Sequence, residues 1–359
     1  MRIFEKLRTG HSPVVIGYLG GSITAGVGAT HPESTSWRAL TTRWFRERFP
    51  EGDITERDAS LKGTGSELAA YRIETDLLRH RPDLIFVEFA VNDHRLSAPK
   101  IVASLEGLIR RARRMLPWTE IMIVLATMRS LAERHPGKAP AATFHEKIAR
   151  HYEIPAVDVG STFVNLIERR KATWESLTTD GCHPTDEGHA IIAREVRSRL
   201  EMIADKSAPT NRLLLPEPLS PERLEWGNLV PVATCSAAPP EWRYENEPVG
   251  PYLQGRLTSN IPGAALKFPF SGDAIGIYWL VAADSGSIDY VIDDWESETV
   301  CAWDAYASRS SRAHYRILAD HLDAGRPHIL RLRVSSTSHV QSNGSYLRIG
   351  AFLVHHAPA

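Results

Sequence analysis

Residues 17–26 read Gly-Tyr-Leu-Gly-Gly-Ser-Ile-Thr-Ala-Gly and directly follow the apolar run Pro13–Ile16. The apolar run predicts a buried β-strand, so the glycines cluster where that strand ends. Glycine lacks a Cβ atom, which lets a turn tighten and lets a substrate approach main-chain N–H groups. The one serine in this turn, Ser22, is therefore either the cap of a following helix or a side chain placed to react.

The spacing of these residues excludes three familiar glycine loops. A phosphate-binding P-loop requires Lys followed by Ser or Thr after its last glycine, but Gly26 is followed by Val27-Gly28. The glycines also do not fit the dinucleotide-binding pattern G-x-G-x-x-G. The nucleophile elbow G-x-S-x-G requires a glycine where Thr24 stands. Ser22 is therefore either a nucleophile in a different kind of loop or the cap of a helix.

Composition narrows the class of protein. A length of 359 residues favours two domains, and a formal net charge of -1 gives no reason to expect nucleic acid or an anionic membrane as a partner. The three cysteines show no C-x-x-C spacing, which argues against a zinc site and favours a reducing compartment. Residues 1–8 lack the apolar core of a signal peptide, and no apolar run reaches the ~18 residues of a membrane span. We expect a cytoplasmic protein, and the sequence does not exclude a homo-oligomer.

Residues 1–205 alternate predicted strands with predicted helices. Strands are expected over 13–19, 54–59, 83–91, 121–126 and 154–159. Helices are expected from 34–36 to 49, after Ser66 to 80, and over 100–116, 141–151, 161–170 and 186–200. This alternation predicts a parallel sheet with right-handed crossovers and helices on both faces. The arginine cluster at 110–114 is expected on a solvated helix face, in preference to a phosphate site.

The character of the chain changes after residue 205. Residues 206–222 contain four prolines and are expected to form a linker. Strand-like runs follow at 274–281, 288–293, 328–334 and 346–353, separated by turn signals. In one of these runs Leu330, Leu332 and Val334 alternate with arginines, which is the period of a half-buried strand. Residues 223–359 are therefore expected to form an all-β sandwich.

Three groups capable of chemistry follow strands of the predicted parallel sheet. Ser22, Gly63 and Asn92 each follow one of these strands. The carboxyl ends of parallel strands meet at one edge of the sheet, where ligands bind. We expect these residues to lie together there, although Asn92 alone is equally compatible with a plain strand-end cap.

A serine nucleophile requires a base that a third group orients. His183 lies in the segment Asp180-Gly181-Cys182-His183-Pro184, where the carboxylate of Asp180 can reach the imidazole from the same short turn. The alternative is an ordinary Asp-Gly turn with a bystander histidine. A backbone N–H of the Ser22 loop, the Gly63 N–H and the Asn92 amide would supply donors for an oxyanion, each worth roughly 3 kcal/mol.

Four segments resemble, in order, the sequence blocks of the SGNH hydrolase superfamily, also called GDSL esterases. They are Gly20–Gly26, the glycine loop around Gly63, Val91-Asn92-Asp93 and Asp180–Pro184, and the resemblance covers about the first 200 residues. It implies a flavodoxin-like three-layer α/β sandwich with a five-stranded parallel sheet over 1–205. The roles it implies are Ser22 as nucleophile, His183 as base, Asp180 as its orienting group, and Ser22, Gly63 and Asn92 as the oxyanion hole. It implies no metal and no cofactor.

The chain departs from the usual blocks at two positions. Gly21 stands where the family usually has an aspartate before the serine, as in a GGSIT variant of the superfamily. Asp58 stands where an asparagine often begins the second block. That loop also contains Gly65, which is an alternative to Gly63 as the oxyanion donor.

The arrangement of the two domains is similar to carbohydrate esterases that carry a C-terminal, jelly-roll-like β-sandwich. The resemblance implies a serine esterase that removes a short acyl group, acetyl, from a small-molecule or oligosaccharide ester. Trp295, Trp303 and Tyr306 lie in polar stretches where a ring could stack on a sugar or pack in the core. A lipid esterase, general acylhydrolase or thioesterase of the same fold is the first alternative. A non-catalytic glycan-binding protein is the second.

Overall fold

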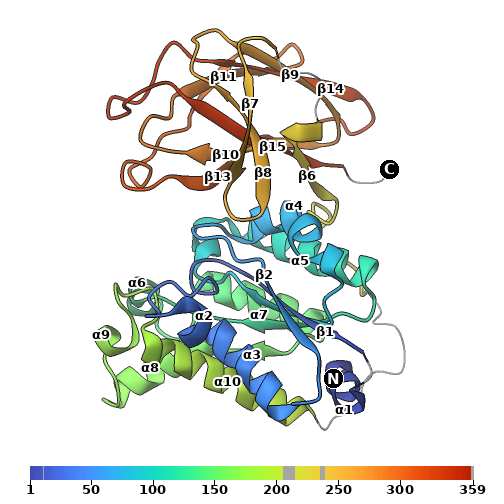
Figure 1. Cartoon of the computed structure of the whole chain (residues 1–359), viewed down its shortest axis with the longest axis vertical. Helices are drawn as coiled ribbons and strands as arrows, with labels where there is room; N and C mark the ends of the chain where they lie inside the picture. The colour runs from blue at the N-terminus through green and yellow to red at the C-terminus, as the bar shows by residue number, and fades with distance from the viewer. Residues whose placement is uncertain (11, 205–214, 235–238, 357–359) are drawn as a thin grey trace. The chain divides into compact units, whose positions relative to one another are not determined.

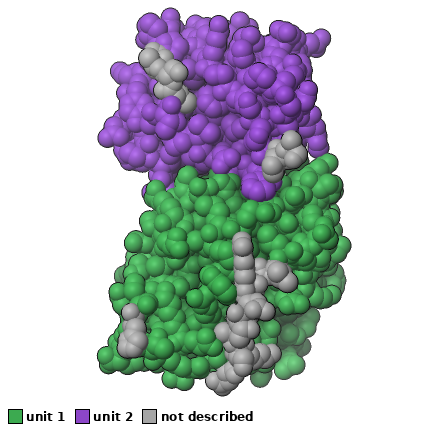
Figure 2. Space-filling model, turned by 90° about the vertical axis from the view of Figure 1, so that its right-hand side faces the viewer, with its two compact units in different colours: residues 1–225 green, residues 226–359 purple. Residues whose placement is uncertain are grey.

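The computed structural model describes residues 1–10, 12–204, 215–234 and 239–356. The chain divides into two compact units, Met1–Glu225 and Trp226–Ala359, which Figure 2 shows in different colours. Of the predicted linker, 206–214 lies outside the described residues, and 215–222 belongs to the first unit. Within the described ranges, no helix is long and apolar enough to cross a membrane.

A five-stranded sheet forms the centre of the first unit. Its strands are β1 (Val14–Gly20), β2 (Ile54–Asp58), β3 (Leu84–Glu88), β4 (Glu120–Val124) and β5 (Ala156–Val157). All pairs are parallel, and the order across the sheet is β2-β1-β3-β4-β5. This is the flavodoxin-like order, and it confirms the predicted fold class. The order reverses at β1 and β3, so ligands are expected beyond the carboxyl ends of these two strands.

Helices cover both faces of this sheet (Figure 1). They are α1 (Arg2–Thr9), α2 (Pro32–Thr35), α3 (Trp37–Arg48), α4 (Ser66–Asp76), α5 (Ala98–Met115), α6 (Arg129–Arg134), α7 (Pro140–His151), α8 (Val159–Glu168), α9 (Trp174–Leu177) and α10 (Asp186–Ala204), with short 3-10 turns η1 (Leu78–His80) and η2 (Asn92–Arg95). One core joins α1, α3, α8 and α10 to the sheet, and the other joins α4, α5 and α7 to its opposite face. Strand β3 is buried along its whole length because neighbouring side chains enter opposite cores.

Three of the four arginines on α5 are buried and only Arg114 is exposed, so the expectation of a solvated helix face was wrong for most of the cluster. Arg110 donates to Glu225 Oε2 at 2.9 Å and to the carbonyl oxygen of Pro216 at 2.7 Å. Residues 215–225 can lie against α5 because Gly107 has no side chain: a Cβ there would stand 2.5 Å from the carbonyl carbon of Leu224. The sequence could not reveal this partner, because Glu225 lies 115 positions from Arg110.

The second unit is a sandwich of two antiparallel sheets, as the sequence predicts. Its elements are β6 (Gly227–Pro231), η3 (Val232–Thr234), β7 (Arg243–Val249), β8 (Leu253–Ser259), β9 (Ala265–Ser271), β10 (Ala274–Val281), β11 (Ser287–Ile292), β12 (Glu298–Cys301), β13 (Arg312–Ala319), β14 (Pro327–Val334) and β15 (Leu347–His355). One sheet has the order β13-β10-β15-β8-β7 with β6 beside β15, and the other has the order β12-β11-β14-β9. Leu330, Leu332 and Val334 are buried in the core while Arg331 and Arg333 are exposed.

Candidate active site

Ser22 lies at the carboxyl end of β1, in a turn that begins no helix. The cap of the next long helix, α3, is Ser36, whose side chain accepts from the N–H of Ala39. The helix-cap interpretation of Ser22 is therefore wrong. The glycine before the serine is required by space, because a Cβ on Gly21 would stand 2.2 Å from Asn92 Oδ1.

The structure brings Ser22, His183 and Asp180 into one hydrogen-bonded chain. His183 Nε2 lies 2.9 Å from Ser22 Oγ, and His183 Nδ1 lies 2.7 Å from Asp180 Oδ2. The other oxygen of Asp180 accepts from the N–H groups of Cys182 and His183, at 3.0 and 2.8 Å. The Asp-Gly turn is present, but His183 is hydrogen-bonded to both Asp180 and Ser22 and is therefore not the bystander of the alternative interpretation. With Nδ1 protonated toward Asp180, Nε2 is free to accept the serine proton.

The loops carrying Ser22 and His183 are held together by contacts that the sequence does not reveal. Gly28 has φ +93°, and a Cβ there would stand 2.3 Å from the carbonyl oxygen of Pro184. Asp186 Oδ1 accepts from the N–H of Thr30 and from the hydroxyl of Thr35, at 2.8 and 2.6 Å. These hydrogen bonds lower the pKa of Asp186 to about 2. Residues more than 150 positions apart are thus fixed beside each other.

Asp180 is ionised at neutral pH. Burial acts to raise its pKa, but the hydrogen bonds from the backbone and ring of His183 and from the backbone of Cys182 outweigh burial and leave the pKa below its usual value. Its side chain is 53% exposed and that of His183 is 25% exposed. The pair therefore opens to solvent, where a large substrate has access to it.

The two predicted side donors of an oxyanion hole lie on the loops after β2 and β3. Asn92 begins η2, and the short distance from Gly21 places its amide oxygen against the Ser22 loop. Gly63 has φ +74°, in the left-handed region that favours glycine. Gly65 caps α4, and a Cβ there would stand 2.3 Å from Asp93 Oδ1. The structure thus gives Gly65 a packing role of its own, which favours Gly63 as the donor.

Glu88 is a fully buried carboxyl group at the end of β3. Its Oε2 accepts from Thr24 Oγ1 at 3.0 Å, and Oε1 has no hydrogen-bond partner in the described chain. Burial raises its pKa to about 7, and the charge of Asp93 acts in the same direction against the hydrogen bonds from Thr24 and Gly21. In the sequence this charged residue interrupts the apolar run of a buried strand, and that interruption is the signal that could have marked it as unusual.

We expect the stability of the first unit to depend on pH through Glu88. The folded-state pKa lies above the unfolded value, so the contribution is fully present below about pH 4.5 and is lost as the pH rises through about 7. Relative to Glu88→Gln, which cannot titrate, the wild type should lose roughly 3 kcal/mol of unfolding free energy across this window. Urea unfolding of both proteins at pH 4, 5, 6, 7 and 8 measures this difference. Glu47→Gln, an exposed control, should follow the wild type; parallel curves for Glu88→Gln and the wild type would contradict the prediction.

Cys182 stands beside the histidine in surroundings that disfavour its thiolate form. Burial, followed by the charges of Asp180 and Glu88, raises the pKa of its thiol to about 11. The thiol therefore stays protonated at neutral pH and is inert. In the chain as described, no group of three or more His, Cys, Asp or Glu side chains is placed to hold a metal ion.

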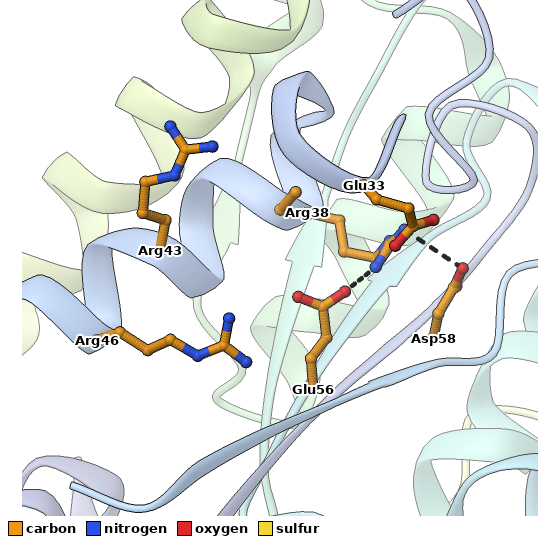
Figure 3. Close-up of a pocket in the computed structure, with 7 residues that line it drawn as sticks. Glu33, Arg38, Arg43, Arg46, Glu56 and Asp58 are labelled. Carbon is orange, nitrogen blue, oxygen red and sulfur yellow. Dashed lines mark hydrogen bonds and ion pairs between the residues drawn. The ribbon is translucent and has the colours of Figure 1, made fainter. Parts of the chain in front are cut away.

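A charged pocket of about 410 Å³ lies beside edge strand β2 (Figure 3). Arg38, which is 2% exposed, forms ion pairs there with Glu33, Glu56 and Asp58. The other charged residues that line it are Arg43 and Arg46. Three arginines face three carboxylates, so the pocket selects for neither anions nor cations, and none of the predicted site residues lines it.

Comparison with protein families decides the identity of the first unit. Residues 18–191 match the model of the GDSL-like lipase/acylhydrolase family. This unit is a GDSL-like hydrolase domain. The matched range contains the Ser22, Asn92 and His183 segments, and membership makes the chain a carboxylic ester hydrolase. A comparison with curated proteins gave no significant match.

The GDSL-like domain and the sandwich also occur together in a solved fold. A two-domain esterase active on acetylated mannans has 21% sequence identity and a TM-score of 0.86, covering 100% of this chain and 95% of its own. The same kind of esterase co-crystallised with mannopentaose has 22% identity and a TM-score of 0.83, covering 100% and 94%. At this identity the likeness establishes the two-domain fold.

The aromatic residues singled out in the sandwich differ in exposure. Trp295 and Tyr306 are 51% and 67% exposed. Trp303 stacks on the ring of His339 with centroids 4.2 Å apart and lines a pocket of about 340 Å³. Trp279, at 2% exposure, is a core residue. The rings of Trp295 and Tyr306 are exposed enough for a sugar to stack on them, whereas Trp279 belongs to the packed core.

Proposed function

We propose that this chain is a serine esterase that removes a short acyl group, acetyl, from a carbohydrate. The observation that carries the proposal is the hydrogen-bonded chain from Ser22 Oγ through His183 to Asp180, with distances of 2.9 and 2.7 Å. A serine at a strand end that is hydrogen-bonded to an oriented imidazole is the arrangement that acyl transfer requires.

In the first half of the reaction Ser22 Oγ attacks the ester carbonyl carbon while its proton passes to His183 Nε2. The negative charge that develops on the carbonyl oxygen accepts hydrogen bonds from the N–H of Ser22, the N–H of Gly63 and the amide of Asn92. When the carbon–oxygen bond to the alcohol breaks, Nε2 returns the proton to the leaving oxygen. The alcohol departs and the acyl group stays on Ser22.

In the second half water releases the acyl group. His183 Nε2 takes a proton from water as the water oxygen attacks the acyl carbon, and the same donors stabilise the second oxyanion. Collapse expels Ser22 Oγ, which recovers its proton from Nε2, and the free carboxylic acid leaves. Asp180 remains ionised throughout and stabilises the imidazolium that forms in each half.

Two observations support a carbohydrate as the substrate. The solved two-domain esterases that share this fold over the whole chain act on acetylated mannans, and one was crystallised with mannopentaose. The half-exposed side chain of Asp180 places the reacting groups at an open surface, where an oligosaccharide or polysaccharide can reach them. Neither observation favours the buried acyl tunnel that a long-chain lipid esterase requires.

The substrate class is tested with a panel of esters offered to the full chain. We expect acetate release from acetylated manno-oligosaccharides, and kcat/KM for 4-nitrophenyl acetate at least about 10-fold above that for the octanoate. A single methylene that does not fit a pocket changes binding by about 1–3 kcal/mol, and the octanoyl chain is several methylenes longer than acetyl. A preference for octanoate or for acyl thioesters would favour the lipid esterase or thioesterase alternative. Binding of oligosaccharides without hydrolysis of any short ester would favour a non-catalytic glycan-binding protein.

A further inference from the structure

Directly after Asn92 the chain places a buried, hydrogen-bonded couple of side chains that the proposed mechanism does not use. Asp93 and His145 both have 0% exposed side chains, and His145 Nε2 donates to Asp93 Oδ2 across 2.8 Å. Nδ1 of His145 is buried without a hydrogen-bond partner in the described chain. Burying a carboxylate costs free energy unless the group is paired or hydrogen-bonded. A couple buried this deeply therefore indicates that its hydrogen bonds hold other parts of the fold in position.

The second oxygen of Asp93 reaches the loop that carries Gly63. Asp93 Oδ1 accepts from the N–H of Ser66, the first residue of α4, at 2.8 Å. A carboxylate at a helix N-terminus is favourable because it meets unpaired N–H groups and the positive end of the helix dipole. Gly65 permits this approach, since any side chain there would collide with the same oxygen. One carboxylate therefore joins the loop after β3 to the loop after β2.

The third element joined by Asp93 is α7. His145 lies on the buried face of α7, and that helix packs on the same core as α4 and α5. The backbone of Asp93 is held as well, since its N–H donates to the carbonyl oxygen of Phe89 at 2.9 Å. Because the side chain and the backbone of Asp93 are both fixed, the neighbouring Asn92 has little freedom to move away from the Ser22 loop.

We propose that Asp93 and His145 are positioning residues for the oxyanion hole. Asp93 fixes the donor of Asn92 relative to the donor of Gly63, and His145 holds the carboxylate of Asp93 in the orientation that does so. The inference rests on the proposed function, because it takes Asn92 as an oxyanion donor. Neither residue touches the reacting atoms, so each acts through Asn92 and the loop of Gly63. Donors must be held within a fraction of an ångström for full effect.

A double-mutant cycle on 4-nitrophenyl acetate tests this positioning role. We expect Asn92→Ala to lower kcat by about 100-fold, and Asp93→Ala to lower kcat by about 30-fold with KM changed less than about 3-fold. In the Asn92→Ala background, Asp93→Ala should cost less than about 3-fold, because the donor that it positions is already absent. Equal losses in both backgrounds would overturn the proposal and leave Asp93 a purely structural residue.

A second pair of variants keeps the test decisive if Asp93→Ala does not fold. His145→Gln retains a side-chain N–H that can donate to Asp93, whereas His145→Ala does not, so kcat should fall at least about 5-fold more in His145→Ala.

Tyr152→Phe is the matched control. It removes a buried hydrogen bond of 2.6 Å to Glu106 next to the end of α7 and should lower stability without changing kcat. Equal kcat in both His145 variants, or a similar loss in Tyr152→Phe, would overturn the proposal. If the wild type itself hydrolyses no ester, the proposed function fails instead.

Discussion

Replacing Ser22 by alanine is expected to lower kcat for 4-nitrophenyl acetate by roughly 10⁴- to 10⁶-fold. The loss is this large because the serine oxygen is both the attacking atom and the carrier of the acyl group, and no neighbouring side chain can replace it. The thiol of Cys182, which precedes His183 in the sequence, keeps its proton because burial raises its pKa to about 11. Steady-state hydrolysis with purified protein measures the effect.

The Ser22→Ala result has a matched control and a direct covalent readout. Ser97, an exposed residue that precedes α5, can be replaced by alanine with no expected change in kcat. Rapid quenching during turnover of a slow ester, followed by mass spectrometry, should find the acyl group on Ser22 in the wild type and on no residue of Ser22→Ala. Full activity of Ser22→Ala, or an acyl group on another residue, would refute the assignment of the nucleophile.

Replacing His183 by alanine is expected to lower kcat by about 10⁴-fold or more. His183 Nε2 is 2.9 Å from Ser22 Oγ, and without it the hydroxyl has no base to take its proton. His183→Ala should fold normally, because the ring is partly exposed and the turn around it is held by backbone contacts. A change in kcat with little change in KM is the expected signature, since the proton transfer occurs only in the reaction itself.

Two further variants separate the base from its surroundings. Asp180→Asn should lower kcat by roughly 10²- to 10³-fold, less than the loss of the base, because its exposed carboxylate is partly screened by solvent. His151→Gln alters another histidine of the same domain, which binds the carbonyl oxygen of Glu217, and should retain wild-type kcat. If His183→Ala kept more than about a tenth of the wild-type kcat, a different base would have to be sought.

Local patterns were sufficient for the sheet and for the reacting side chains. The buried run ending at Asn92 and the alternation from Leu330 to Val334 are set by side chains that are neighbours in the sequence, so periodicity alone reveals them. The same holds for Asp180 and His183, which share one turn. The sequence therefore predicted which groups would lie at the edge of the sheet, and the order β2-β1-β3-β4-β5 places them there.

Contacts between distant segments could not be predicted in this way. Arg110 of α5 looked solvated because its partner Glu225 lies more than 100 positions away. The couple of Asp93 and His145 also spans 52 positions, and neither residue signals the other. Burial and pairing depend on which surfaces the folded chain brings together, and a single sequence contains no direct record of that.

The sequence thus determined which chemical groups are available around Ser22. The tertiary structure decided the distances between those groups. Glycines around a serine after a strand, followed far along the chain by Asp180 and His183, predict a nucleophile and its base. Only the folded chain decides that Gly28 meets Pro184, that Gly21 meets Asn92 and that one carboxylate oxygen of Glu88, Oε1, is buried without a hydrogen-bond partner in the described chain. The reason is physical: residue types set what a group can do, whereas distances between loops depend on packing across the whole sheet.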